Sequence, residues 1–229
     1  MSTVSRPTSS SDRPSPPLEH SSSSSSSSSN LKTEASVSKF LDKCPVLKAG
    51  GHSSFFSVLP CSSTESVYLG RSGIGPPFFY MYTSLFADLH VSLPFNRFTM
   101  GVLRALNVAP TQIHPNTWAS IQAFRLLCDV LRLCPTPSSF LSYYTSHPAQ
   151  PASWHSLIGR SGSVLFNSFA FSYKRFKERF VKVIVWPEAT TYFFDEAVRS
   201  WFPVYWTGKP HDFKEWSRLV GNADEMEIL

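Results

Sequence analysis

Carboxylates are scarce through the middle of this 229-residue sequence, which carries a formal net charge of +5. Between positions 49 and 187 the acidic residues are Glu65, Asp88, Asp129 and Glu178. Enzymes that transfer nucleotides with Mg²⁺ need two or three carboxylates that converge on the metal ions. So few acids argue against an enzyme of this class.

The carboxylates that could be nominated for such a site are Asp88, Asp129, Glu188 and Asp195. Asp129 has a simpler explanation, because it follows Arg125 by four residues in a helical pattern and can pair with it. A nucleotidyl-transfer enzyme would require the four carboxylates to cluster in the fold. We predict no catalytic residue, no metal site and no cofactor.

The chain also lacks the cysteine and nucleotide-binding motifs of common enzyme classes. Its four cysteines show no C-x-x-C spacing and no zinc-knuckle cluster, so we expect reduced thiols. No G-x-S-x-G, P-loop or dinucleotide fingerprint occurs. No apolar run reaches the 18 or so residues of a membrane helix, and the first residues do not resemble a signal peptide. We expect a soluble, intracellular protein, with nucleus and cytoplasm both open.

Serine and proline dominate residues 1 to about 50, and nine consecutive serines run from Ser21 to Ser29. Such a segment cannot bury enough apolar surface to offset its chain entropy, so we predict a disordered leader, with one helical turn at most at 36–41. Residues 51–74 are interpreted as a loop that leads into the domain. Residues 208–229 are interpreted as a C-terminal tail in which a helix starts near position 212.

Apolar residues recur at three- and four-residue spacing in the first half of the domain, which is typical of helices. The predicted helices span residues 78–89, 95–106, 116–133 and 139–146. Asn107 is the expected stop of the second helix. His114, in the connector before the third, is expected to make a local hydrogen bond rather than to bind a metal.

The third predicted helix has two distinct faces. Its core face should carry Trp118, Ile121, Phe124, Leu127, Cys128 and Leu131. A polar stripe of Gln122, Arg125, Asp129 and Arg132 lies on the other side. This pattern makes the helix a principal element of the core.

The hydrophobic period changes after the prolines near position 150. Residues 154–158 and 163–166 predict a β-hairpin, and residues 181–186 (VKVIVW) give the best strand pattern in the chain. Residues 173–180 are helical in pattern, and 190–206 is partly strand-like. The predicted class is α+β, with a mainly helical first half at about 78–146 and a small antiparallel sheet at about 154–206.

One segment has a composition that suits nucleic acid. Its cations are Lys174, Arg175, Lys177, Arg179 and Lys182, and they alternate with Tyr173, Phe176 and Phe180. Such a cluster can neutralise phosphates while exposed aromatic rings stack on bases. The alternative, which is more common for charge runs, is a solvated face whose phenylalanines belong to the core.

The sequence resembles the gypsy-type transposon domain family of plants over about residues 75–207. The most specific block is the connector APTQIHPNTW, from Ala109 to Trp118. Further similar blocks are GPPF at 75–78, LPF at 93–95, SYKRFK at 172–177 and FPVYW at 202–206. The resemblance indicates a retroelement origin.

What the resemblance implies about activity is limited, because the family has no agreed catalytic residues that could be transferred to this chain. Together with the aromatic-rich core and the scarcity of acids, it predicts a non-enzymatic domain that acts in protein or nucleoprotein assembly. Self-association, or binding to other proteins of the same element, is the expected partnership. The alternative is a nucleic-acid-binding or nucleotidyl-transfer protein of transposition.

Overall fold

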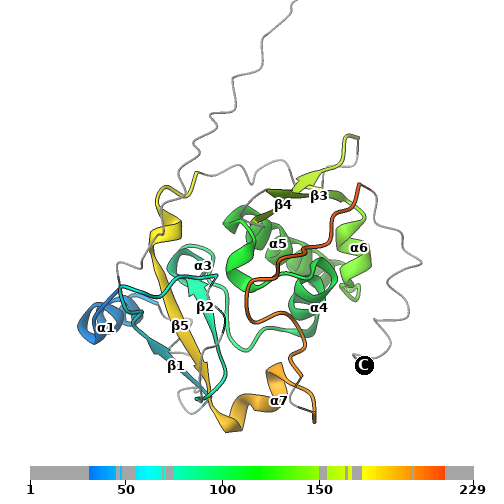
Figure 1. The fold of residues 1–229 in the computed structure, drawn as a ribbon. Helices are drawn as coiled ribbons and strands as arrows, with labels where there is room; N and C mark the ends of the chain where they lie inside the picture. Colours follow the sequence, from blue (N-terminus) through cyan, green and yellow to red (C-terminus); the bar gives the residue numbers. More distant parts are fainter. Residues whose placement is uncertain are drawn as a thin grey trace, which may run out of the picture.

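The computed structural model describes residues 31–44, 47, 55–68, 70, 75–149, 154–162, 165–166, 172–197 and 199–214. This part of the chain is an α+β fold, as predicted: a three-stranded antiparallel sheet lies beside a group of helices (Figure 1). A separate two-stranded hairpin lies at one end of the helices. None of the described helices is both long and apolar enough to cross a membrane.

The central strand of the sheet is β5 (Phe180–Val185), which pairs with β1 (Phe56–Leu59) on one side and β2 (Phe78–Tyr82) on the other. Both pairings are antiparallel, and Val183 lies opposite Val58 in one neighbour and Phe79 in the other. β-Branched residues fill β5 because a strand buried between two neighbours favours them. The strand predicted at 181–186 is therefore confirmed to within one residue at each end.

The helix predicted over 78–89 is wrong in its first half. Residues 78–82 form β2, and only α3 (Thr83–Ala87) is helical. The run FFYMY is apolar at every position, so a continuously buried strand and a buried helix give the same short pattern. Pairing with β5 decides between them. The predicted division into a helical first half and a β second half is accordingly not confirmed, since β1 and β2 precede the main helices.

Two longer helices follow the prediction closely. Helix α4 (Arg97–Leu106) begins at Asn96, whose side chain accepts a hydrogen bond from the Thr99 amide at 2.9 Å, and ends at Asn107 with φ 53°. Asparagine tolerates this left-handed conformation, so the predicted stop is confirmed. Helix α5 (Pro115–Leu131) starts after His114 and ends in the left-handed residue Arg132.

Part of the predicted leader is folded. Helix α1 (Glu34–Asp42) is closed at its start by a capping box, in which Thr33 and Ser36 bond to each other's backbone amides. Val37 is buried, and Phe40 packs its ring on Phe86 of α3 at 6.4 Å. Residues 1–30, including the serine run, lie outside the described residues. The predicted loop at 51–74 contains β1.

The predicted hairpin of 154–158 with 163–166 is also wrong. Strand β4 (Trp154–Gly159) pairs instead with β3 (Tyr144–Ala149), which precedes it. Consequently the helix predicted at 139–146 is shorter and earlier, as α6 (Pro137–Leu141). Residues 165–166 are not in a strand, and 163–164 lie outside the described residues. Proline normally argues against a strand, so Pro148 makes 144–149 an unfavourable strand sequence, but an edge strand such as β3 tolerates it.

The remaining segments are mostly irregular. Within 173–180 only η3 (Phe176–Glu178) is helical, as one 3-10 turn, so the longer predicted helix is wrong. After β5, η4 (Pro187–Ala189) leads into α7 (Thr190–Phe193), and the strand-like pattern of 190–206 is reduced to one bridge between Phe194 and Ser200. Residues 212–214 are not helical, and 215–229 lie outside the described residues.

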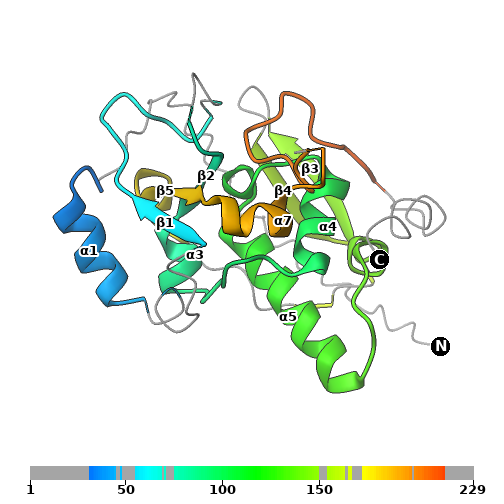
Figure 2. The same cartoon turned by 90° about the horizontal axis from the view of Figure 1, so that it is seen from below.

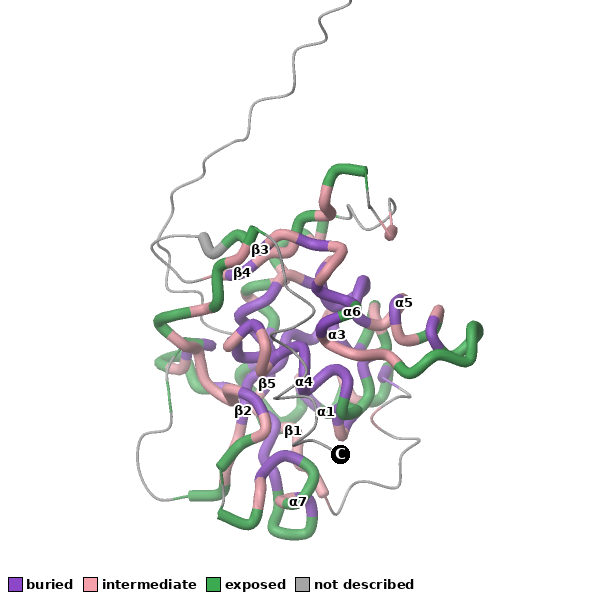
Figure 3. Tube along the Cα trace, turned by 90° about the vertical axis from the view of Figure 1, so that its right-hand side faces the viewer, coloured by how far each residue is buried: buried purple, intermediate pink, exposed green. Residues whose placement is uncertain are grey.

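A cluster of four phenylalanines joins the sheet to the helices. Phe79 of β2, Phe95 before α4, Phe193 of α7 and Phe202 are all buried, and every pair has ring centroids between 5.5 and 6.2 Å apart. Figure 3 shows the buried segments concentrated between the sheet and the helices, with exposed segments around them. Tilted and edge-on aromatic pairs of this kind contribute beyond the area that they bury.

The connector before α5, residues 107–114, fixes the C-terminal segment through buried hydrogen bonds. The Gln112 amide is fully buried: its oxygen accepts from the backbone amides of Ala109 and Thr207, and its nitrogen donates to the Thr207 carbonyl at 2.7 Å. The Trp118 indole donates to the Pro110 carbonyl at 3.1 Å. The connector thus has an architectural role in this fold.

We expect Gln112→Leu to lower the free energy of unfolding by about 3 kcal/mol, at roughly 1 kcal/mol for each hydrogen bond lost. Gln122→Leu is the matched control, because the Gln122 side chain makes one bond, to the Leu89 carbonyl. Gln122→Leu should lower the free energy of unfolding by about 1 kcal/mol. Urea unfolding of both variants checks this, and equal losses would contradict the assignment.

Candidate functional site

The structure divides the five predicted nucleic-acid-binding cations between different environments. Lys174 and Arg179 line a pocket, whereas Arg175, Lys177 and Lys182 are engaged with neighbouring side chains. Arg175 has φ 59° and donates twice to one oxygen of Glu178, at 2.9 and 2.7 Å. The five cations therefore lie in different local environments, two of them lining the pocket and three of them in contact with neighbouring side chains.

Lys177 lies over the indole ring of Trp154, with its Nζ 4.6 Å from the ring centroid. Lys177 as a whole is exposed, and the partial desolvation of its ammonium group lowers its pKa. The contact holds the lysine against β4 as a cation–π pair. Lys177 thus contributes to packing in the described structure.

Lys182 belongs to a polar network on the sheet. It forms an ion pair with Glu65, and the same carboxylate accepts from the Ser62 amide at 2.7 Å and from the Tyr80 hydroxyl at 3.2 Å. Burial raises the pKa of Glu65, but the hydrogen bonds from Lys182, Ser62 and Tyr80 outweigh it and keep the pKa below its ordinary value. Burial and the nearby Glu65 raise the pKa of Cys61 to about 12, so this thiol stays protonated.

We expect Lys182→Met to destabilise the protein by about 1–3 kcal/mol, because it leaves a mostly buried carboxylate without its cation. The control is Arg199→Met, which breaks the ion pair with Asp195, where the arginine side chain is 82% exposed. That change should shift the unfolding midpoint less. Urea titration at pH 7 separates the two, and an equal shift would rule out the network as a stabilising element.

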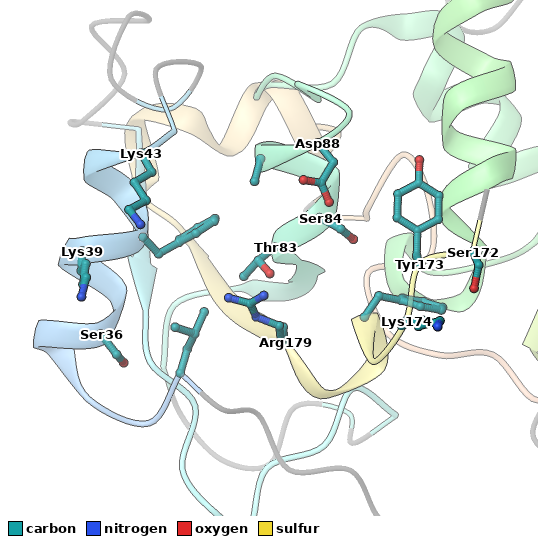
Figure 4. A pocket seen from close by; sticks show the side chains of 14 residues that line it. Ser36, Lys39, Lys43, Thr83, Ser84, Asp88, Ser172, Tyr173, Lys174 and Arg179 are labelled. Carbon is teal, nitrogen blue, oxygen red and sulfur yellow. The ribbon is translucent and has the colours of Figure 1, made fainter.

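The pocket that Lys174 and Arg179 line has a volume of about 570 Å³. Its walls come from α1, α3 and residues 172–179, as Figure 4 shows. From α1 and its C-cap it receives Ser36, Lys39, Phe40 and Lys43, which are spaced three, one and three residues apart and so share one helix face. From α3 and its C-cap it receives Thr83, Ser84, Ala87 and Asp88.

Positive charge dominates this pocket. Lys39, Lys43, Lys174 and Arg179 line it, and Asp88 supplies its one carboxylate. None of the four cations makes an ion pair within the part of the chain that the structure describes. Cations that share a hollow without acidic partners repel one another, and an anion bound among them relieves that repulsion.

Hydroxyl groups add neutral donors to the same walls. Ser36, Thr83, Ser84 and Ser172 line the pocket together with the ring of Tyr173. The Ser84 Oγ is buried and has no hydrogen-bond partner among the described residues. A buried polar atom without a partner is uncommon in native proteins, and a ligand oxygen is one group that satisfies it. The arrangement suits a ligand with several negatively charged oxygens.

A backbone hydrogen bond and ring contacts hold the second and third walls in place. The amide of Thr83, at the start of α3, donates to the Arg179 carbonyl at 2.9 Å, which ties the second wall to the third. Phe176 packs on Tyr82 at 5.0 Å and on His114 at 5.3 Å. His114 is thus both a support for the pocket and, through Nδ1, an acceptor for the Asn116 amide at 3.1 Å. The predicted local hydrogen bond of His114 is confirmed.

Sequence reasoning missed the α1 wall, because residues 1 to about 50 were assigned to a disordered leader. A signal was present: Ser36, Lys39, Phe40 and Lys43 follow helical spacing, and Thr33 with Ser36 offers a helix cap. The segment is too short to form a stable helix in isolation, so its spacing alone does not predict one. Its packing on Phe86 and β1 provides the missing stability.

The nominated carboxylates do not form a metal site within the described residues. Asp129 pairs with Arg125 at 3.3 Å, as predicted, and Asp195 pairs with Arg199 at 2.7 Å. Across the described chain no group of three or more His, Cys, Asp or Glu side chains is placed to hold a metal ion. The structure thus brings together none of the described carboxylates in the way that two-metal nucleotidyl transfer requires.

Ser146, His155 and Asp212 lie close together, but they form a structural clamp. The Ser146 hydroxyl accepts from the Phe213 amide at 2.6 Å, and the His155 Nε2 lies 3.2 Å from the His211 carbonyl. Ser146 and His155 are both buried, so no substrate reaches them. The group holds residues 211–213 against β3 and β4, and burial lowers the pKa of His155.

No family model, no curated protein and no solved structure matches this chain.

The pH dependence of stability should report the environment of His114. Burial, and secondarily Lys177, lowers its pKa, so as the pH falls the unfolded chain takes up this proton before the folded one. Stability should therefore decrease below about pH 6.5. His114→Asn keeps an N-cap acceptor without a titrating ring. Between pH 7.5 and 5.5 this variant should therefore lose less of its free energy of unfolding than the original protein does.

Urea unfolding at the two pH values measures this difference. His114→Asn should keep part of the dependence of stability on pH, because the pKa of His155 is lowered as well. If the variant keeps the full pH dependence of the original chain, His114 is not the responsible group.

Proposed function

We propose that this chain is a non-enzymatic, retroelement-derived protein that binds nucleic acid through the basic pocket and acts in nucleoprotein assembly. The observation that carries the proposal is that Lys39, Lys43, Lys174 and Arg179 all line one pocket and have no ion-pair partners in the described residues. Lysine and arginine neutralise phosphates, and this contact is the main source of affinity for nucleic acid.

The ligand that we favour is a single strand. A volume of about 570 Å³ is in the range that encloses a small ligand, and it suits a short stretch of one strand better than the width of a duplex. Hydroxyls of Ser36, Ser84 and Ser172 are additional donors for phosphate oxygens, and the ring of Tyr173 is available for base stacking. Affinity should therefore depend on salt more than on base sequence.

The retroelement origin rests on the resemblance at residues 75–207. Two pocket residues from the predicted set, Lys174 and Arg179, fall inside that region, whereas Lys39 and Lys43 precede it. The proposed binding site thus combines the region of resemblance with α1. A catalytic role in transposition is the weaker alternative, because the described carboxylates are engaged in ion pairs or dispersed.

Fluorescence anisotropy with a labelled 12-nucleotide single strand tests the proposal between 50 and 200 mM salt. We expect measurable binding at low salt, at least tenfold weaker binding for Lys39→Gln/Lys43→Gln and for Lys174→Gln/Arg179→Gln, and a salt slope reduced by about 1.4 for two lost phosphate contacts. The matched control, Arg199→Gln/Lys209→Gln, removes two exposed cations outside the pocket and should change affinity less than about twofold.

A 12-base-pair duplex of the same sequence and the free mononucleotide are measured alongside. Tighter binding to the duplex would contradict the single-strand assignment, and saturation by the mononucleotide alone would indicate a small-molecule site. Absence of binding at 50 mM salt, with folding verified by circular dichroism, would overturn the proposal.

A further inference from the structure

The C-terminal end of α5 exposes a group of large aliphatic side chains. Leu126 is 55% exposed, Val130 78%, Leu131 55% and Leu133 59%. These four residues are called the α5 tip below. Figure 2 shows this end of the helix projecting from the rest of the fold. The earlier turns of the helix are different, because Trp118, Ile121 and Phe124 are buried.

The exposure of the α5 tip is not what its sequence predicts. Leu131 was assigned to the core face, yet more than half of its surface is open to solvent. Single exposed leucines are ordinary, but four large aliphatic residues exposed within eight consecutive positions are not. Such patches on soluble folds mark surfaces that another molecule covers.

The helix is firmly closed at this end, so the patch is a fixed surface. The Leu133 amide donates to the Cys128 carbonyl at 2.9 Å, and the Arg132 amide donates to the Asp129 carbonyl at 3.3 Å. With Arg132 at φ 58°, these two bonds make a Schellman motif. The motif holds Leu133 against the last turn of the helix.

The charges beside the patch are arranged for self-pairing. Arg125 and Asp129 lie one turn apart, half exposed, along one flank of the aliphatic stripe of Leu126 and Val130. When two such helices run antiparallel about a two-fold axis, Arg125 of each copy approaches Asp129 of the other. A parallel arrangement would bring like charges together. Within one copy the two side chains pair with each other at 3.3 Å, and in the antiparallel dimer each can pair instead with the opposite charge of the other copy.

We propose that the α5 tip is the interface for a second copy of this chain, with the two α5 helices antiparallel. The inference rests on the assembly role proposed above and names its partner, but it involves none of the residues of the basic pocket. A patch of a few side chains belongs at the small end of protein interfaces, so the dimer should be weak, in the micromolar range.

Cys134 provides a direct report on this geometry. It is exposed, it is free, and it follows Leu133 immediately, whereas Cys44, Cys61 and Cys128 are buried. In the antiparallel dimer the two-fold axis passes midway between Arg125 and Asp129, so the two Cys134 thiols lie about 21 Å apart along the helices at 1.5 Å per residue, and a bismaleimide cross-linker with a span of about 20–25 Å should join them. The buried cysteines should not react.

Sedimentation velocity of the full chain between 1 and 200 µM, in reductant, is the primary test. We expect a concentration-dependent dimer that Val130→Glu and Leu126→Glu weaken at least tenfold. Ile158→Glu is the matched control, because it places the same charge at an aliphatic residue on β4 that is 53% exposed, and it should leave the dimer unchanged. Arg125→Glu should weaken the dimer, and Arg125→Glu/Asp129→Arg should restore it, because the exchange retains opposite charges across the axis.

Three results would overturn the proposal. The first is a monomer at 200 µM. The second is a dimer that Val130→Glu leaves intact. The third is a monomer whose α5 tip is protected from hydrogen exchange, which would show that another part of the same chain covers it. Cross-linking through Cys134 should yield a dimer band that Val130→Glu abolishes.

The dimer and the proposed nucleic-acid binding fail in different ways. Lys174→Gln/Arg179→Gln should sediment as the original protein does. Val130→Glu should still bind the single strand as a monomer. Loss of both properties in one variant would indicate a folding defect, which circular dichroism detects, and such a variant is replaced by Leu126→Glu.

Discussion

The aromatic contact between β2 and the segments around it is the constraint on which the rest of the fold depends. Phe79, Phe95, Phe193 and Phe202 come from four separate parts of the sequence, and each is buried against the other three. Because aromatic rings are large and stiff, one such cluster fixes the sheet, the start of α4, α7 and the C-terminal segment together. Helices and strands that are short by themselves thereby acquire fixed positions.

The connector before α5 extends this constraint to the basic pocket. Gln112 and Trp118 satisfy buried backbone groups, and His114 packs on Phe176 at 5.3 Å. Phe176 belongs to the irregular segment that forms one wall of the basic pocket. A buried, fully bonded connector thus holds a segment that has little regular structure of its own, which is how a loop can present charged groups at fixed positions.

Charge in this protein has two different uses. Lys182 and Lys177 are engaged with Glu65 and with the ring of Trp154, where they contribute to packing. Lys39, Lys43 and Arg179 have no ion-pair partner in the described structure and line a hollow. The cations of the basic run at 174–182 therefore have different contacts, which depend on the neighbouring side chains and cannot be read from composition.

The α5 tip differs from these charged sites, because it is an apolar surface that the described part of the fold leaves exposed.

Features that depend on local interactions could be predicted from the amino-acid sequence: α4 with its stop at Asn107, α5, the strand β5, the pairing of Arg125 with Asp129, and the local hydrogen bond of His114. Each follows from periodicity, capping or i,i+4 spacing. Tertiary structure decided the features that depend on distant partners. β5 converts the apolar run at 78–82 into a strand, β3 rather than a later segment pairs with β4, and packing on Phe86 and β1 orders α1. It also decided which basic residues share a pocket, because residues 36–43 and 172–179 meet only when the sheet brings their neighbours together.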